Sequence, residues 1–304
     1  MPKKIFSVLM PFMILLGITS IACISSYLIA LSFDDSTILR KLMIRLSQIM
    51  LLLSIFPISK WLGLTKEMLG YTSFKIMLKQ FWYGFGLSLL VLLPVFLTLY
   101  GLGVHSIDTT KAWTFGWITK KIGIAFGLAL LIGLIEESVF RGLLLTSLRK
   151  YLPAFTAILI SSIYYAGLHF LDSKSLVSDE LLTLENSFSL LIDAYRNVFA
   201  LQDWTAFLAL CSVGLFLGVL RWQSDLNLAV CIGCHTGWVT LIRMIKSTSQ
   251  VDFNSPYAFL VSHYDGIIGL FVACWLILLL GSYFLFRFCT QKTRNKNTDY
   301  AFEK

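Results

Sequence analysis

Residues 130–145 read LLIGLIEESVFRGLLL, an apolar run that is interrupted by two glutamates and one arginine. An ionised side chain near the middle of a membrane helix costs at least about 2.5 to 3.5 kcal/mol, so such residues usually face a cavity and a partner. Glu136, Glu137 and Arg141 therefore mark a candidate functional site. The alternative is a structural charge cluster, or a helix that ends earlier and leaves the three residues among lipid headgroups.

The rest of the chain has the composition of a membrane protein. Of its 304 residues, 57% are hydrophobic and only 14% are charged, which is far from the usage of soluble domains. Since a helix needs about 20 apolar residues to cross the hydrocarbon core, the sequence predicts an all-α, polytopic transmembrane helical bundle of about eight spans. The expected spans are 5–31, 42–63, 80–103, 121–147, 153–171, 204–222, 226–246 and 264–288.

The distribution of charge predicts the orientation of the bundle. With a cytoplasmic N-terminus, the inside segments hold 14 basic and four acidic residues, whereas the outside segments and adjoining span ends hold 10 and 11. The positive-inside rule then places both the N- and C-termini in the cytoplasm. The net charge of +8 is thus mostly a signal of topology, and without a basic soluble face we expect no nucleic-acid partner.

Two longer connections are expected to carry structure of their own. The segment 103–120 contains three aromatic residues typical of an interfacial anchor, Trp113, Phe115 and Trp117. The segment 171–203 has apolar residues at helical spacing, which predicts a surface helix on the non-cytoplasmic side; these are Leu181, Leu184, Phe188 and Leu191. The glycine pairs Gly123/Gly127 and Gly214/Gly218 predict close helix contacts.

The N-terminus could be a cleaved signal peptide, but the apolar run continues to Leu31 and favours an uncleaved span. The six cysteines lie almost entirely within apolar spans, where they act as small hydrophobic residues, so no disulfide framework is expected.

The spacing within the charged run predicts two different roles for its glutamates. On a helix, Glu137 and Arg141 share a face, with the acid on the N-terminal side, which is the favourable order for an ion pair. Glu136 points about 100° away. One carboxylate is therefore expected to be held by Arg141, while the other is left free to take and give a proton.

Two histidines in later spans could join this site. His169 closes the span at 153–171, and His235 lies well inside the apolar run 226–242. With a rise of about 1.5 Å per residue, Glu136, His169 and His235 lie at depths that permit them to meet. An interfacial position for His169 is the alternative.

A carboxylate and two imidazoles can activate water by two routes. Zinc held by His169, His235 and Glu136 would lower the pKa of its bound water. Without a metal, Glu136 would be the general base, one imidazole would orient the water, and the other would stabilise the oxyanion. Both routes stay open, because the spacing is no tight metal motif.

Cys231 to His235 also spell C-x-x-C-H, the pattern of covalent haem attachment. Since the motif lies inside an apolar span, we expect no haem.

The ordered set of residues resembles a known family. Glu136-Glu137-x-x-x-Arg141, then Tyr165-x-x-x-His169, then His235 in a late span is similar to the CPBP group of intramembrane proteases. That group includes the type II CAAX prenyl endopeptidases and the bacterial Abi proteins of bacteriocin processing and self-immunity. The resemblance covers about 122–244.

The resemblance implies an intramembrane endopeptidase that cuts a membrane-associated, prenylated or other peptide substrate. Glu136 would activate water, His169 would act with it, and His235 would bind metal or stabilise the oxyanion. Glu137 and Arg141 would support the site. Helices and an interfacial segment would occupy 1–120, the protease core 121–246, and the last helix with a basic cytoplasmic tail 247–304. An integral protein of the bacterial inner (plasma) membrane, with lipid and a peptide or protein substrate as partners, is implied as well.

Two positions depart from the family pattern. Tyr165 replaces a phenylalanine, and Val239 replaces an asparagine often found four residues after the last histidine. Val239 keeps open a non-catalytic immunity or scaffold protein of the same fold. Acids and histidines within spans also occur in proton-coupled transporters, which form a third hypothesis.

Overall fold

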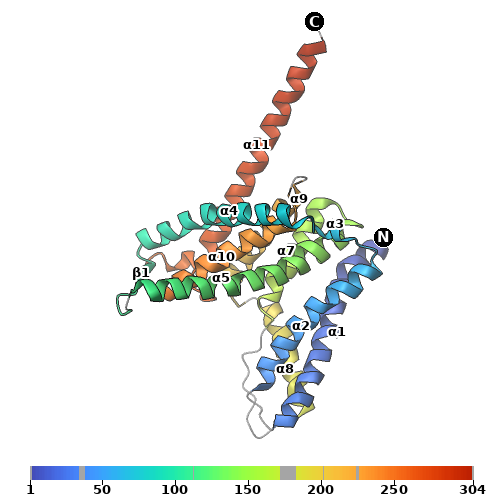
Figure 1. Ribbon diagram of the computed structural model, residues 1–304, viewed down its shortest axis with the longest axis vertical. Helices are drawn as coiled ribbons and strands as arrows, with labels where there is room; N and C mark the ends of the chain where they lie inside the picture. The colour runs from blue at the N-terminus through green and yellow to red at the C-terminus, as the bar shows by residue number, and fades with distance from the viewer. Residues whose placement is uncertain are drawn as a thin grey trace.

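The computed structural model describes residues 2–33, 38–111, 113–171, 183–200, 202–223 and 226–302. Apart from one two-stranded ribbon, its regular elements are helical (Figure 1). Seven helices of this described part are long and apolar enough to cross a membrane, which confirms the predicted all-α membrane architecture. The predicted span at 153–171 is a helix of only 15 residues, Ala154–Leu168, which is shorter than a full crossing requires.

The elements follow one another in a simple order along the chain. They are α1 (Pro2–Phe33), α2 (Leu39–Trp61), α3 (Lys66–Leu69), α4 (Phe74–Gly101), β1 (His105–Ile107), α5 (Phe115–Glu137), the π-helix η2 (Ser138–Leu144), α6 (Leu145–Arg149), α7 (Ala154–Leu168), α8 (Leu184–Ala200), α9 (Trp204–Trp222), α10 (Leu228–Thr248), β2 (Ser249–Val251), the 3-10 helix η3 (Ala258–Leu260) and α11 (Leu270–Phe302).

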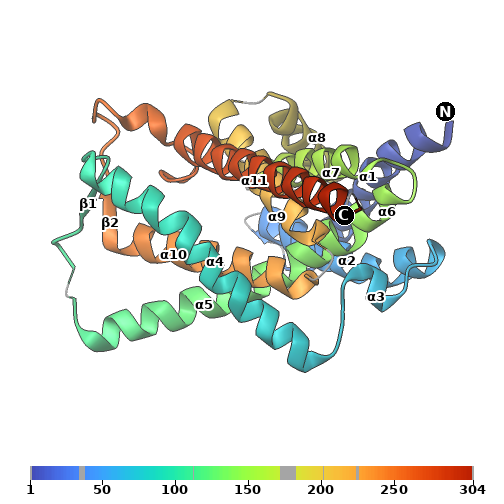
Figure 2. The same ribbon diagram turned by 90° about the horizontal axis from the view of Figure 1, so that it is seen from above.

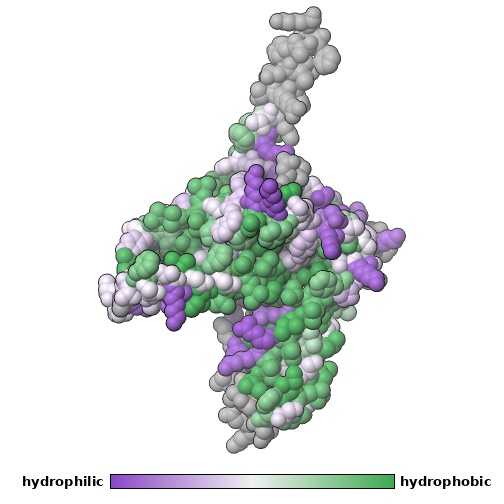
Figure 3. Space-filling view, viewed as in Figure 1, coloured by the Kyte–Doolittle hydropathy of each residue, from purple (hydrophilic) through white to green (hydrophobic). Residues whose placement is uncertain are grey.

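Helix α10 is the centre of the bundle. It packs against α4 and α5 (Figure 2), while α7 packs on α9 and α9 on α11. Helix α1 contacts both α2 and α8, and the three helices project away from this bundle (Figure 1). Every side chain from Leu228 to Trp238 is buried, whereas hydrophobic residues cover much of the visible outer surface (Figure 3). The polar groups in the first half of α10 therefore face protein and not lipid.

Glycines allow α4 and α10 to approach so closely. A Cβ on Gly233 would lie 1.9 Å from the backbone oxygen of Phe81, and one on Gly84 would lie 2.0 Å from that of Val230. The predicted contact at Gly214 and Gly218 is present, since a Cβ on either would lie 2.7 Å from a side chain of α7.

The prediction for the other glycine pair was wrong. A Cβ on Gly123 or Gly127 would meet nothing within 4 Å. Small residues permit close packing, but the neighbour they accommodate is decided by the tertiary fold.

The two long connections are only partly as expected. The segment 103–120 contains strand β1, which pairs antiparallel with β2 so that His105 lies opposite Val251. No pattern in the sequence had predicted this ribbon. The predicted helix in 171–203 is present as α8, with Phe188 and Leu191 packed toward α1 and α2. Leu181 lies outside the described residues.

Substitution of Gly233 by Ala should destabilise the protein, because the new methyl group would collide with a helix backbone that cannot move aside alone. We expect a loss of about 1 to 3 kcal/mol or more, measured as a lower thermal unfolding midpoint in detergent. The matched variant Gly127→Ala has open space and gains helix propensity, so its midpoint should be unchanged or higher. Equal midpoints for the two variants would contradict the packing described here.

The ribbon should weaken as the pH falls. His105 is buried, its Nε2–H donates to the oxygen of Gly266 (2.9 Å), and burial lowers its pKa. Since the unfolded chain takes up a proton below about pH 6.5 and the folded histidine resists it, folding stability is lost as the pH falls through that value.

The half-buried Asp265 beside His105 has a pKa raised by desolvation, which acts in the opposite direction at lower pH. The variant His105→Gln keeps Asp265 and a donor to Gly266. Thermal midpoints in detergent at pH 7.5 and 5.5 should differ less for this variant than for the wild type; an equal difference would refute the role of His105.

Candidate active site

A π-helical turn follows the two glutamates. Helix α5 ends at Glu137, and η2 continues over Ser138–Leu144 before α6 begins. The carbonyl oxygen of Phe140 accepts both from the backbone of Leu145 and from the Ser161 hydroxyl at 3.2 Å, so the altered ladder leaves this oxygen satisfied. Single π-turns of this kind are frequent at functional sites. The sequence had predicted an uninterrupted α-helix here.

Glu137 is the anchor of the site. Its Oε1 accepts from Arg141 Nη1 at 3.0 Å, as the spacing predicted, and from His235 Nδ1 at 2.7 Å. All three residues are at most 4% exposed. The bond between Glu137 and His235 joins α5 to α10, and no pattern in the sequence had predicted it.

Tyr165 forms one wall of this network. Its ring lies 4.4 Å from the Arg141 guanidinium carbon and 4.6 Å from the ring of His169. A tyrosine thus provides the aromatic face that Arg141 packs against, and a phenylalanine would provide the same face.

His169 caps the C-terminus of α7 and is held by its own helix. Its Nδ1 lies 2.8 Å from the backbone oxygen of Tyr165. Because a carbonyl only accepts, Nδ1 carries the proton and Nε2 is the free nitrogen. A carboxylate likewise only accepts, so His235 carries a proton on the Nδ1 that faces Glu137. Both imidazoles therefore present Nε2 to the space beside Glu136.

Glu136 meets both histidines, as the depths in the membrane allowed. Its Oε2 lies 3.9 Å from Nε2 of His169 and 3.9 Å from Nε2 of His235. This oxygen is buried and has no hydrogen-bond partner among the described residues. At 3.9 Å the atoms are too far apart for direct hydrogen bonds, but one water molecule between them would reach both partners.

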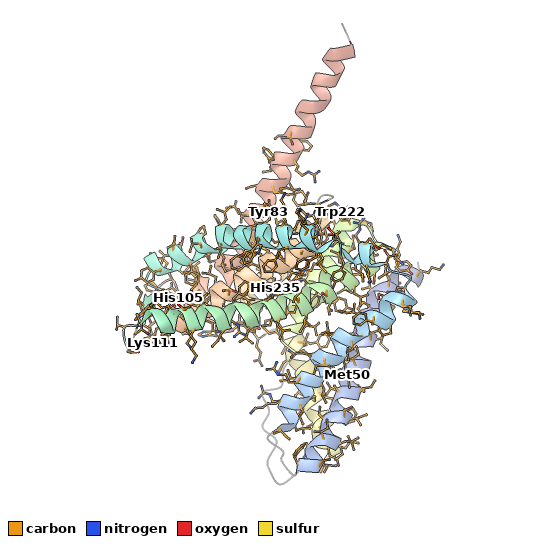
Figure 4. All side chains as sticks on the ribbon, viewed as in Figure 1. Met50, Tyr83, His105, Lys111, Trp222 and His235 are labelled. Carbon is orange, nitrogen blue, oxygen red and sulfur yellow. The ribbon has the colours of Figure 1, made fainter. Side chains whose placement is uncertain are left out.

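These groups lie at a cavity of about 750 Å³. Figure 4 places His235 inside the bundle between α4 and α5, away from the labelled His105 and Lys111. Val239 lines the cavity one turn beyond His235. The lining also includes polar and charged residues that sequence reasoning did not assign to the site, namely Lys121, Arg243, Lys246, Tyr264 and Asp265. Their positions near span ends had been interpreted only as flanking charge.

The described residues contain no group of three or more His, Cys, Asp or Glu residues close enough to hold a metal ion. Two ligands of one tetrahedral zinc lie about 3.4 Å apart, which is shorter than the separation of Glu136 Oε2 from either imidazole. Glu136 and the two histidines are therefore spaced more widely here than the ligands of one zinc ion.

One comparison with known proteins gives a match. Residues 117–241 match the family model described as Type II CAAX prenyl endopeptidase Rce1-like. The matched segment runs from α5 to α10 and contains Glu136, Glu137, Arg141, His169 and His235. Searches of curated proteins and of solved structures give no match.

Removal of Arg141 should lower the free energy of unfolding, because the buried carboxylate of Glu137 then lacks its guanidinium partner. Arg141→Met removes the guanidinium partner of Glu137, and we expect a loss of about 3 to 5 kcal/mol in denaturant unfolding in detergent. Glu137→Gln added to Arg141→Met removes the carboxylate that lost this partner and should restore part of the stability. The matched variant Arg196→Met breaks an exposed pair with Asp193 (3.3 Å) and should have little effect. A double variant no more stable than Arg141→Met would contradict this account.

Proposed function

Because the chain belongs, through residues 117–241, to the type II CAAX prenyl endopeptidase Rce1-like family, we propose that it hydrolyses a peptide bond within the membrane, with Glu136 as the group that activates water. The observation that carries this proposal is the Oε2 atom of Glu136, which has no hydrogen-bond partner among the described residues and lies 3.9 Å from the Nε2 atoms of both histidines.

The first step is attack by water. A water molecule between Glu136 and His169 donates one proton to the Glu136 carboxylate, while His169 Nε2 orients it by accepting its second hydrogen bond. The water oxygen forms a bond to the scissile carbonyl carbon, and the carbonyl oxygen becomes an oxyanion. Such general base catalysis contributes about 10² to 10⁴ in rate.

The second step is collapse of the tetrahedral intermediate. His235, protonated on both nitrogens and held by Glu137, donates from Nε2 to the oxyanion. Glu136 then gives its proton to the leaving nitrogen as the C–N bond breaks. Glu137 keeps the imidazole oriented and compensates its charge, which makes Glu137 and Arg141 positioning residues.

The mechanism proposed here uses no metal, and the ligand spacing described above supports this choice. A metalloprotease would lose its activity with a chelator and regain it with zinc. In the glutamate mechanism, 1,10-phenanthroline leaves the rate unchanged.

The substrate is proposed to be a prenylated or otherwise membrane-associated peptide. A cavity of about 750 Å³ is within the usual range for sites that enclose a ligand. The bacterial inner membrane is proposed as its location from the resemblance to the bacterial members of the family. The charge distribution supports the proposal that both termini lie in the cytoplasm. Val239 contributes an apolar wall where relatives often carry an asparagine, so any further oxyanion donor must come from another group.

Substitution of Glu136 by Gln should lower kcat by about 10² to 10⁴ without loss of folding, since glutamine fills the same volume. The assay is cleavage of a prenylated CAAX peptide by the protein in liposomes, together with mass-spectrometric mapping of new peptide termini in membranes that express either form. Phenanthroline and zinc additions provide the metal control.

A folded Glu136→Gln variant that cleaves at the wild-type rate would refute the mechanism. If no cleavage occurs with either form while a biological effect persists in both, the non-catalytic scaffold is favoured instead. A pH-dependent solute flux in liposomes that is abolished by Glu136→Gln, without proteolysis, would favour the transporter.

A further inference from the structure

A second cavity, of about 290 Å³, lies where the ends of α6 and α9 meet the short helix α3. Four cationic residues line it, namely Arg141, Arg149, Lys150 and Arg221, and the described residues of its lining include no acid. Trp222 also lines it, and Figure 4 shows this residue on the other side of His235 from His105 and Lys111. The active-site mechanism uses only Arg141 of this set.

Arg221 is fixed in place with one donor unused. Its Nη2 donates to the backbone oxygen of Met68 at 3.2 Å, while its Nε is buried and has no partner among the described residues. Gly70, at φ +96°, makes room for this guanidinium, because a Cβ there would lie 2.7 Å from Nη2. An unpaired N–H of a charged group is costly to bury, so an acceptor is expected at this point.

Arg149 and Lys150 add charge at the open side. The guanidinium carbon of Arg149 lies 3.4 Å from the centre of the Trp222 ring. Stacking uses the face of a guanidinium and leaves its N–H edge for an anion. Lys150 Nζ donates to the backbone oxygen of Leu62. Both residues are exposed, so a ligand can reach them.

Arg141 forms the inner wall. One of its nitrogens is engaged by Glu137, but Nη2 is buried and lacks a partner among the described residues. The single carboxylate of Glu137 cannot neutralise a group of four cations. Like charges gathered beside a low-dielectric interior repel one another. An anion bound in the cavity would reduce this repulsion.

We propose that this cavity binds a phosphate group. Arginine forks match the oxygens of phosphate in two-pronged hydrogen bonds, and lysine adds a point charge. The site lies at helix ends where a membrane span stops, and basic pockets in such positions bind the headgroups of anionic lipids. The phosphate has two possible sources, a lipid headgroup or free inorganic phosphate. This proposal is independent of the proteolytic function.

The test is native mass spectrometry of the full-length protein in detergent, incubated with phosphatidylglycerol or with phosphatidylcholine. Phosphatidylcholine carries the same phosphate beside a choline cation that the cluster repels. We expect the wild type to retain about tenfold more phosphatidylglycerol, as one charge-assisted hydrogen bond accounts for a difference of that order. A parallel arm measures the thermal midpoint with millimolar inorganic phosphate and asks whether phosphate displaces the lipid.

The variants are Arg149→Gln, Arg221→Gln and the control Arg287→Gln. Arg287 is an exposed arginine packed over Tyr283 (5.9 Å) at the far end of another span, so it matches Arg149 outside the cavity. Arg149→Gln and Arg221→Gln should lose the preference, and Arg287→Gln should keep it. Arg149→Gln removes only a stacked, exposed side chain, so it tests the site even if Arg221→Gln fails to fold.

The outcomes separate the sources. Retention of phosphatidylglycerol that depends on Arg149 assigns the site to a lipid headgroup. A shift of the thermal midpoint by inorganic phosphate that depends on Arg149, with no lipid preference, assigns it to free phosphate. A folded Arg149→Gln variant that matches the wild type in both arms would overturn the proposal.

Discussion

The Glu137 carboxylate, with its two donors, is the interaction on which the rest of the structure depends. Arg141 and His235 come from different helices and meet on one oxygen, Oε1. Breaking a buried ion pair costs several kcal/mol because one charge is left uncompensated. The network therefore fixes how the π-turn after α5 sits against α10, and it also sets which nitrogen of His235 is free. The Oε1 atom of Glu137 thus both holds the two helices together and orients the imidazole of His235 in the proposed active site.

The close approach of helices makes this network possible. Gly84 and Gly233 let α4 lie directly on α10. The first half of α10 is therefore buried, and His235 is not in contact with lipid. A buried imidazole with one nitrogen on a carboxylate and the other facing a cavity is an oriented group. The face of α10 that carries the glycines thus packs directly on the backbone of α4. The face that carries His235 is left to line the active site.

Local pattern determined what the sequence could predict. Apolar length gave most of the spans, and the four-residue spacing gave the pair of Glu137 with Arg141, because both depend only on helix geometry. The bond from Glu137 to His235 joins residues 98 positions apart, and no spacing rule applies to it. The π-turn, the ribbon at His105 and the cavity cations such as Lys246 likewise depend on tertiary contacts. Gly127 and Gly233 look alike in sequence, yet only one of them touches another helix.

In the proposed mechanism, the charges of the two glutamates, Arg141 and His235 balance one another. With Glu136 and Glu137 ionised and Arg141 and His235 cationic, the cluster is neutral, which a low-dielectric interior favours. When water gives its proton to Glu136, that negative charge disappears from the protein and reappears on the oxyanion, close to His235. The net charge of cluster and substrate is then unchanged through the step. A site arranged in this way needs little reorganisation as the reaction proceeds, and it explains why a second carboxylate, with no part in bond making, is held beside the first.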